Sequence, residues 1–389
     1  MERVRDYLHR MDKVYWLIIT AVSVFSLVIL KSVSRATNTD YFQTQLFAVI
    51  LGYGAAFVIT LFDYKDIASF WHVIAGFSVL LMVYTILFGD AVTSSGGVNA
   101  RAWINIAGRT FQSSELVKIA FMITYAKHIS ILKENNLLHR FWHVCLLGVH
   151  ALIPVMLCHL QGDDGAAVVF IAMFLFMSFG GGVQKRYFLL IAGVALLALP
   201  LMWNYVLEPY QKARFTAVYN LDDPSVMMGD GWQQYQARTS IGSGQLWGKG
   251  LFNGPRVEEN MVTFQHSDFI FSVVGEELGF VGCTALILLL AVLLIKTLLI
   301  AFKARDTLGT CICFGFFGLI FVQSVVNIGM CLALFPVMGV TLPFFSAGGS
   351  SAACLYFGYG LVQAVSMRRM EVEGLDLARQ GRRKPALKL

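Results

Sequence analysis

Residues 267–301 read SDFIFSVVGEELGFVGCTALILLLAVLLIKTLLIA, a polar opening that leads into a long apolar stretch. Crossing the hydrocarbon core of a bilayer takes about 20 mainly apolar residues in helical form, so this stretch is long enough to span a membrane. A strand of a closed barrel, the other structure that can span lipid, would alternate polar and apolar residues, and this stretch does not. It therefore predicts a transmembrane helix.

Nine further apolar runs have similar character. They lie at approximately 14–32, 42–62, 69–89, 113–133, 140–160, 165–182, 187–206, 308–334 and 347–367. Hydrophobic residues make up 57% of the 389 residues and charged residues only 14%, a composition that excludes an ordinary soluble domain. We predict an all-α integral membrane protein with about ten transmembrane helices.

Lysine and arginine are concentrated on one side of this arrangement. If the N-terminus is cytoplasmic, most of them fall in cytoplasmic loops and the C-terminal tail, and the short outer loops carry only Lys31, Arg35, Arg101 and Arg109. Because cytoplasmic loops are enriched in these two residues, both termini are predicted to be cytoplasmic. The net charge of +6 follows from this topology and does not indicate nucleic-acid binding.

One outer segment is much longer than the others. Residues 207–266 are predicted to form a large extracellular loop between helices 7 and 8, far beyond a minimal connection. The first apolar run lacks a cleavage site, so we expect it to stay as the first span. We predict one polytopic membrane domain over residues 1–369, which includes this loop, and a basic cytoplasmic tail over residues 370–389.

Asp268 is the first candidate for chemistry. It lies at the outer end of the eighth span, where water meets lipid, and partial desolvation there would raise the pKa of its carboxyl toward that of a general base. The residues allow a second interpretation equally well. Ser267 could cap the helix, and Asp268 could favour the positive end of the helix dipole.

Charged residues inside or at the end of other spans are further candidates, because a charge in lipid is costly. Glu276 and Glu277 follow Asp268 by about two helical turns, and structural pairing is the favoured role for at least one of them. Glu115 and Lys118 are three residues apart, so they can pair on a helix.

Two outer segments could contact a substrate. The guanidinium of Arg101 suits phosphate, and Trp103 suits either a sugar or, more simply, the aromatic belt at the membrane surface. Residues 342–351 contain proline, glycines and serines, which predict a broken turn that could present N–H groups to an anion. Close helix packing through small residues would explain the same composition. The sequence contains no nucleotide-binding glycine loop, zinc motif or serine triad.

Taken together, these residues closely resemble the SEDS family, the polytopic peptidoglycan glycosyltransferases RodA, FtsW and SpoVE. The motifs follow one another in the order and at the spacing of the family, over most of the chain. They are Gly231-Trp232-Gln233 with Gln236, residues 241–244, 248–251, 266–271, 275–282 and 327–330, Pro336, Gly339 and residues 342–351.

The resemblance implies an enzyme that polymerises lipid II, an undecaprenyl-pyrophosphate disaccharide-pentapeptide, on the outer face of the bacterial cytoplasmic (inner) membrane. It also implies a class B penicillin-binding protein as the transpeptidase partner, and no nucleic acid. The catalytic general base of the family falls on Asp268. No cofactor is certain, a divalent cation stays open, and the ligands of any metal are unknown.

The resemblance also assigns two groups of residues around that base. Those assigned to substrate binding are Arg101, Trp103, Glu115, Lys118, Gln233, Lys249, Ser346, Gly348, Gly349 and Ser350. Those assigned to support of the site are His266, Glu276, Glu277 and Asn327.

The sequence departs from the family pattern at several positions. Ser113 replaces the proline of Gln-Pro-Ser-Glu, and Gly162 replaces the proline of Gln-Pro-Asp-Leu-Gly. Ala102 stands where a second arginine is frequent, and Ala347 stands where tyrosine is common. These departures leave Asp268 intact and indicate a divergent member, whose short N-terminus favours a RodA-like or SpoVE-like protein.

Two other functions stay open at this point. A ten-helix protein with charges in its spans could be a lipid II transporter (flippase), an option that Glu276, Glu277 and Asn327 keep open. An inactive scaffold that recruits a class B penicillin-binding protein is the other, and the intact Asp268 favours an enzyme over it. Elongation, division and sporulation roles are not distinguished.

Overall fold

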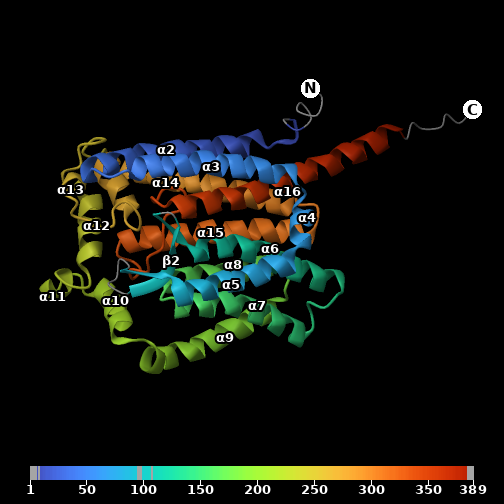
Figure 1. Cartoon of the computed structure of the whole chain (residues 1–389), viewed down its shortest axis with the longest axis horizontal. Coiled ribbons are helices and arrows are strands. Elements are labelled where there is room, and N and C mark those ends of the chain that lie inside the picture. Colours follow the sequence, from blue (N-terminus) through green and yellow to red (C-terminus); the bar gives the residue numbers. More distant parts are fainter. Residues whose placement is uncertain (1–6, 8, 94–98, 107, 383–389) are drawn as a thin grey trace, which may run out of the picture.

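The computed structural model describes residues 7, 9–93, 99–106 and 108–382. This part of the chain contains ten long helices, and all of them except α9 lie side by side as one bundle (Figure 1). They are α2 (Lys13–Thr37), α3 (Tyr41–Leu61), α5 (Trp71–Phe88), α6 (Ser113–Glu134), α7 (Phe141–Leu160), α8 (Asp164–Gly181), α9 (Lys185–Leu201), α14 (Ile270–Phe302), α15 (Thr307–Cys331) and α16 (Gly349–Arg382). A short π-helix, Met202–Val206, continues α9.

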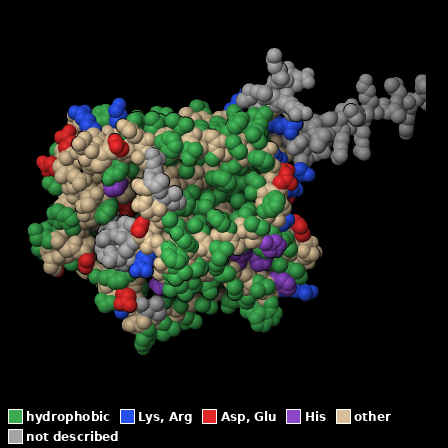
Figure 2. Space-filling model, in the orientation of Figure 1, with side chains coloured by type: hydrophobic (Ala, Val, Ile, Leu, Met, Phe, Trp, Pro, Cys, Tyr) green, Lys and Arg blue, Asp and Glu red, His purple; other side chains and the backbone are tan. Residues whose placement is uncertain are grey.

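Eight of these helices, all except α6 and α16, are long and apolar enough to cross a membrane. The other two are more polar, and many of their polar side chains are buried against neighbouring helices and not exposed to lipid. Hydrophobic side chains cover the middle of the face in Figure 2, and most charged side chains gather toward its ends. The predicted all-α membrane architecture is confirmed.

The connecting segments divide between the two ends of the bundle. At one end, which we call the loop end, lie α10 (Pro209–Tyr219), α11 (Pro224–Met227), α12 (Trp232–Ser243) and α13 (Pro255–Glu258) (Figure 1). They belong to the long segment between the seventh and eighth long helices. The start of α2, the end of α16 and the short helix α4 (Tyr64–Ser69) lie at the other end, the terminal end. α16 runs on to Arg382 without a break at the expected boundary after residue 369.

α14 is longer than a bilayer requires. Its 33 residues extend about 50 Å at 1.5 Å per residue, against a hydrocarbon core of about 30 Å. The helix is interrupted at Gly279, which has φ 62° and ψ −160°. Most side chains between Ile270 and Gly279 are buried by other parts of the protein. The first turns of α14, with Glu276 and Glu277, therefore lie among the loops and not deep in the span.

The interruption of α14 is filled by the segment 244–250. Gly250 N donates to the freed carbonyl of Glu277 at 3.0 Å. Gly248 has φ +80°, and a Cβ added there would lie 2.1 Å from the same carbonyl oxygen. Only glycine fits so close an approach in this backbone conformation. The two glycine-rich motifs, 244–250 and 275–282, are thus joined by several backbone hydrogen bonds.

The segment before α6 forms a small antiparallel sheet that the sequence analysis did not predict. Its strands are β1 (Asp90–Thr93), β2 (Asn99–Ile106) and β3 (Arg109–Gln112), in the order β1-β2-β3. In its register Trp103 lies opposite Gln112. Strands of four to eight residues carry too few alternating positions to be recognised between long apolar runs.

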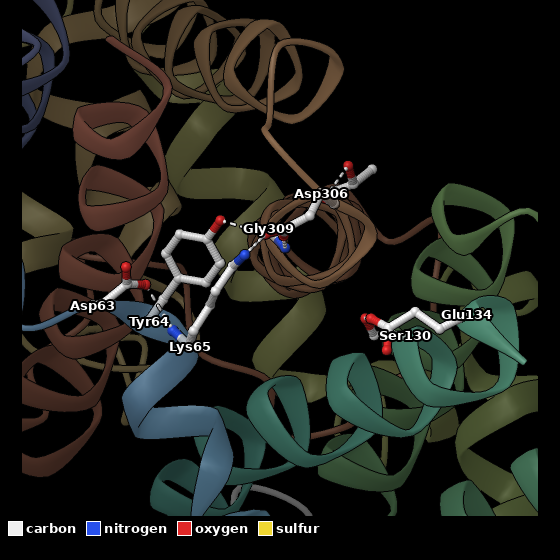
Figure 3. A network of polar contacts seen from close by, with 8 residues as sticks. Asp63, Tyr64, Lys65, Ser130, Glu134, Asp306 and Gly309 are labelled. Atoms are coloured by element: carbon white, nitrogen blue, oxygen red, sulfur yellow. Dashed lines mark hydrogen bonds and ion pairs between the residues drawn. The ribbon is translucent and has the colours of Figure 1, made fainter. Parts of the chain in front are cut away.

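A polar network fastens the terminal end (Figure 3). The carboxylate of Asp306 contacts the Lys65 ammonium at 2.8 Å and accepts from the Tyr64 hydroxyl at 3.0 Å and from Gly309 N at 2.9 Å. Burial would raise the pKa of Asp306, but Lys65, Gly309 and Tyr64 together lower it below its usual value. The network ties α4 to the beginning of α15. Within α6, Ser130 donates to Glu134 nearby.

α9 stands apart from the other long helices (Figure 1). Only 6% of its apolar stretch is buried inside the protein, so nearly all of its surface is left to contact lipid. Its first turn is attached more firmly, because the Tyr187 hydroxyl donates to the carbonyl of His139 at 2.8 Å.

Candidate active site

Asp268 lies in the turn that leads into α14 at the loop end. Its side chain is 8% exposed. α14 begins at Ile270 with Phe269 at the N-cap position, so Asp268 and Ser267 both precede the cap. Capping by Ser267, the alternative that the sequence allowed, therefore does not account for this motif. Asp268 remains beside the N-terminus of α14, the positive end of the helix dipole.

The turn around Asp268 is held by the irregular segment between α15 and α16. Ala347 N donates to the carbonyl of His266 at 2.8 Å, and the Ser346 hydroxyl donates to the carbonyl of Ser267 at 2.7 Å. Ser346 Oγ also accepts from Leu342 N at 2.7 Å. The predicted broken turn is present up to Gly348, before α16 begins at Gly349. Its residues Ser346 and Ala347 support the Asp268 turn.

His266 supports the same turn from the other side. Its ring stacks on Tyr41 at the start of α3, with 4.2 Å between ring centroids and 6° between planes. Burial lowers the pKa of His266, so the imidazole is neutral near pH 7. It therefore contributes packing beside Asp268 and no positive charge.

A second cluster at the loop end centres on Glu115 and Lys118 in the first turns of α6. The Lys118 Nζ lies 2.8 Å from Glu115 Oε1, and the two side chains are 2% and 5% exposed. The pairing expected from their spacing is confirmed by this contact. A pair so well buried is held by protein on all sides, which keeps the ammonium in one place.

Asp163, which the sequence analysis noted only within a departing motif, joins this cluster. Its Oδ2 accepts from Gln112 Nε2 at 2.7 Å and from the Ser114 hydroxyl at 3.1 Å. Burial raises the pKa of Asp163, against the lowering influence of Ala166 N–H, Lys118 and these two donors. The signal available in the sequence was an aspartate directly before an apolar run.

Arg101 and Trp103 stand on β2 beside the same cluster. Arg101 N donates to the carbonyl of Gln161, two residues before Asp163, at 2.9 Å. The Arg101 side chain is exposed and Trp103 is half-buried. The sheet thus places the exposed Arg101 on a strand whose backbone is bonded to the motif that contains Asp163.

Glu276 and Glu277 are fully buried and hold the turn 252–257. Glu276 Oε1 accepts from Arg256 N at 2.8 Å, and Glu277 Oε1 accepts from the hydroxyl of Ser32 on α2. A Cβ added to Gly254 would lie within 3.3 Å of atoms of both side chains, so this turn passes directly against them. These contacts agree with the structural role favoured for the two glutamates.

The other predicted substrate-binding residues lie at the loop end in different surroundings. Gln233 uses both ends of its amide inside the protein, donating to Thr263 Oγ1 and accepting from Thr263 N, each at 3.0 Å. The side chain of Lys249 is exposed. Gly348 N donates to Gln45 Oε1 at 3.4 Å. Gly349 and Ser350 are half-buried in the first turn of α16.

Arg214 is a residue that the sequence analysis missed. It lies on α10, and its guanidinium donates to the carbonyl of Val337 at 3.4 Å and covers the ring of Tyr210. Burial lowers the pKa of Arg214. Arg214 lies two positions after Tyr210-Gln211-Lys212 in the long loop, and no recognisable motif or spacing there predicts a contact for it.

The described residues include no group of three or more His, Cys, Asp or Glu side chains arranged to hold a metal ion. What the loop end offers is a nearly buried carboxylate in a braced turn, together with a buried ammonium and an exposed guanidinium. A carboxylate can take a proton from a hydroxyl, and the two cations can stabilise an anionic leaving group.

The sequence is similar to a known protein family and to several of its members. A family model described as cell cycle protein, for FtsW, RodA and SpoVE, matches residues 10–371. Peptidoglycan glycosyltransferase MrdB of Escherichia coli (strain K12) is 32% identical over 302 residues, which cover 77% of this chain and 80% of MrdB. Probable peptidoglycan glycosyltransferase FtsW of Geobacter sulfurreducens is 31% identical over 374 residues, which cover 93% of this chain and 96% of that protein.

The fold is also similar to that of a solved structure. A chain in a peptidoglycan synthase complex, described as coordinating polymerization and crosslinking, superposes with a TM-score of 0.77 and 28% sequence identity. The match covers 92% of this chain and 98% of that chain.

Proposed function

Because the chain belongs to the FtsW, RodA and SpoVE family of cell cycle proteins, we propose that it is a peptidoglycan glycosyltransferase that polymerises lipid II. Its relatives MrdB and FtsW carry that activity in their names. The observation that carries the proposal is the braced, nearly buried Asp268 at the same end of the bundle as the Glu115–Lys118 pair.

In this proposal Asp268 is the general base. Its carboxylate takes the proton from a sugar hydroxyl of one substrate molecule. The hydroxyl oxygen then forms a bond to the anomeric carbon of a second molecule, whose sugar is attached to the pyrophosphate lipid. The bond from that carbon to the pyrophosphate lipid breaks, and its electron pair leaves on the pyrophosphate oxygen. Arg101 and Lys118 stabilise the charge on the leaving group. Trp103 lies where it can pack against a sugar.

The location of the substrate sets the orientation. Lipid II that is polymerised outside the cell would meet the loop end, so we place the loop end on the outer face of the bacterial inner membrane and both termini in the cytoplasm. The terminal end carries Lys65 of α4 and Lys185 at the start of α9, as expected for the cytoplasmic side. A class B penicillin-binding protein fits as the transpeptidase partner, since the related synthase complex couples polymerization to crosslinking.

Two features bear on a transporter. Glu276 and Glu277, which kept this function open, are used to hold a turn at the loop end. Asn327 likewise bonds to backbone carbonyls. Each of the three side chains makes a structural contact that needs no path for a headgroup through the bundle, and the glycosyltransferase is the better-supported function.

Asp268→Asn tests the proposal. It removes the base and keeps the volume, so polymerisation of lipid II by the purified protein should fall by about 10²–10⁴-fold. Thermal unfolding in detergent should stay near that of the unaltered protein. The reaction is run with and without the partner transpeptidase, and glycan strands are resolved by electrophoresis. Near-normal polymerisation by a folded Asp268→Asn would end the role of Asp268 as base.

A further inference from the structure

Three consecutive carbonyls of the Asp268 turn accept hydrogen bonds from one part of the chain. Those of His266 and Ser267 are bound by Ala347 N and Ser346 Oγ. That of Asp268 is bound by the side-chain amide of Asn327 on α15, at 2.7 Å. Cys331 Sγ also approaches the Asp268 carbonyl, at 3.7 Å. A thiol is a weak donor, so the Asn327 amide makes the stronger of the two bonds to the backbone of the proposed base.

The Asn327 amide makes a second bond of the same kind. Its Nδ2 also donates to the carbonyl of Val340, at 2.7 Å, so one NH₂ group joins two carbonyls. The side chain is fully buried. Its Oδ1 has no hydrogen-bond partner among the described residues. A flipped amide would turn that oxygen toward both carbonyls, so the two acceptors fix which atom is the nitrogen.

The second acceptor belongs to a segment that the long outer loop contacts. Arg214 of α10 donates to the carbonyl of Val337, and Gln234 of α12 donates to the carbonyl of Phe335 at 2.7 Å. Gly165 of α8 approaches so closely that an added Cβ would lie 2.3 Å from the Met338 carbonyl oxygen. Residues 335–340 are therefore fixed from three sides, and they give Asn327 a firm support.

We propose that Asn327 is the positioning residue of the site, whose amide sets the backbone of Asp268 against the fixed segment 335–340. The inference rests on the proposed function, because it concerns the geometry of the base. A displacement of about 1 Å at a reacting group can cost about 100-fold in rate, so a single bridging amide can control turnover without touching substrate.

A purely structural role is the alternative. Buried asparagines often just satisfy backbone groups, and their loss lowers stability throughout the protein. The two roles differ in what they affect. Loss of a positioning residue lowers kcat per folded molecule more than it changes KM, and it loosens only the turn that the residue holds. Loss of a general stabiliser lowers the fraction of folded protein and leaves kcat per folded molecule unchanged.

Asn327→Leu is the test variant, since it keeps the volume and removes both donors. We expect kcat for lipid II polymerisation to fall by about 10–100-fold while KM changes by less than about twofold. In hydrogen–deuterium exchange, a peptide covering 264–272 should exchange faster, because the amides of Ser267 and Phe269 that donate to the Phe264 carbonyl lose their support. Peptides from the terminal end should not change.

Ser324→Ala is the matched control. Ser324 lies on the same helix and is also buried, but its hydroxyl donates only to Ile320 O within α15. This variant should keep both kcat and the exchange of 264–272. If Asn327→Leu does not fold, Asn327→Asp replaces it, because that carboxyl keeps the shape and offers at most one O–H donor.

Native kcat in a folded Asn327 variant, or unchanged exchange over 264–272, would overturn the inference. So would equal effects of Asn327→Leu and Ser324→Ala. If the unaltered protein makes no glycan from lipid II, the proposed function fails, and the exchange measurement still decides whether Asn327 holds the turn.

Discussion

The buried pair of Glu115 and Lys118 allows stability and chemistry to be separated. Its Nζ–Oε1 distance is 2.8 Å, and both side chains are at most 5% exposed. Removing one partner of such a pair typically costs about 3–5 kcal/mol, because the other charge is left buried and uncompensated. We therefore expect Lys118→Met to lower the unfolding temperature of the detergent-solubilised protein by about 5–10 °C.

The two single variants should differ. Lys118 also lowers the pKa of Asp163, so its loss leaves two carboxylates without their cation. Glu115→Gln keeps a hydrogen-bond acceptor and leaves Lys118 beside Asp163, so it should cost less. The double variant Glu115→Gln/Lys118→Met should recover part of the loss, since replacing both partners of a buried pair is often close to neutral.

Activity decides what the lysine is for. If Lys118 stabilises the pyrophosphate leaving group, the double variant regains stability and still fails to polymerise lipid II. Lys65→Met is the control, because the Lys65–Asp306 pair is partly exposed at the opposite end and should cost less than about 1 kcal/mol. Stable single variants would refute the energetic argument, and an active double variant would remove Lys118 from the chemistry.

Two further predictions concern the loop end. Arg101→Ala should weaken lipid II use strongly and Arg101→Lys should restore only part of it, because a point charge does not reproduce the guanidinium fork. Equal, near-normal rates in both variants, measured against lipid II concentration, would show that Arg101 only anchors β2. Asp230→Cys, an exposed position beside Gly231, should react with an impermeant maleimide on intact cells, whereas Lys185→Cys should react only after permeabilisation. Six of the seven native cysteines are buried and Cys145 is half-buried, so a background lacking Cys145 suffices, and the reverse labelling pattern would invert the topology.

The long helices and the buried pair could be predicted from the sequence because their signals are local. Apolar runs of sufficient length are visible one at a time, and Glu115 and Lys118 lie three residues apart on one helix. The contacts of the Asp268 turn are not local. They join His266, Asn327 and Ser346, and no spacing rule connects residues so far apart.

Motif residues also proved to have roles that their type does not reveal. Gln233, a predicted substrate-binding residue, is bonded to Thr263 through both ends of its amide. Glycines 248 and 279 allow one backbone to enter the gap in another. A sequence shows that such residues form a pattern, but it cannot separate those that touch substrate from those that hold the residues that do.

The departures from the family pattern acquire a physical meaning once the structure places them. Ser113 and Gly162 belong to the two motifs that meet at Asp163, which Gln112 and Ser114 both bind. Gly162 has φ +77°, a conformation closed to proline, and Ser113 Oγ is buried without a hydrogen-bond partner among the described residues. Both changes therefore lie beside the cluster of Glu115, Lys118 and Asp163, whereas the Asp268 turn keeps its own set of donors. We therefore expect this chain to differ from its relatives in how it binds the leaving group and not in how its base acts.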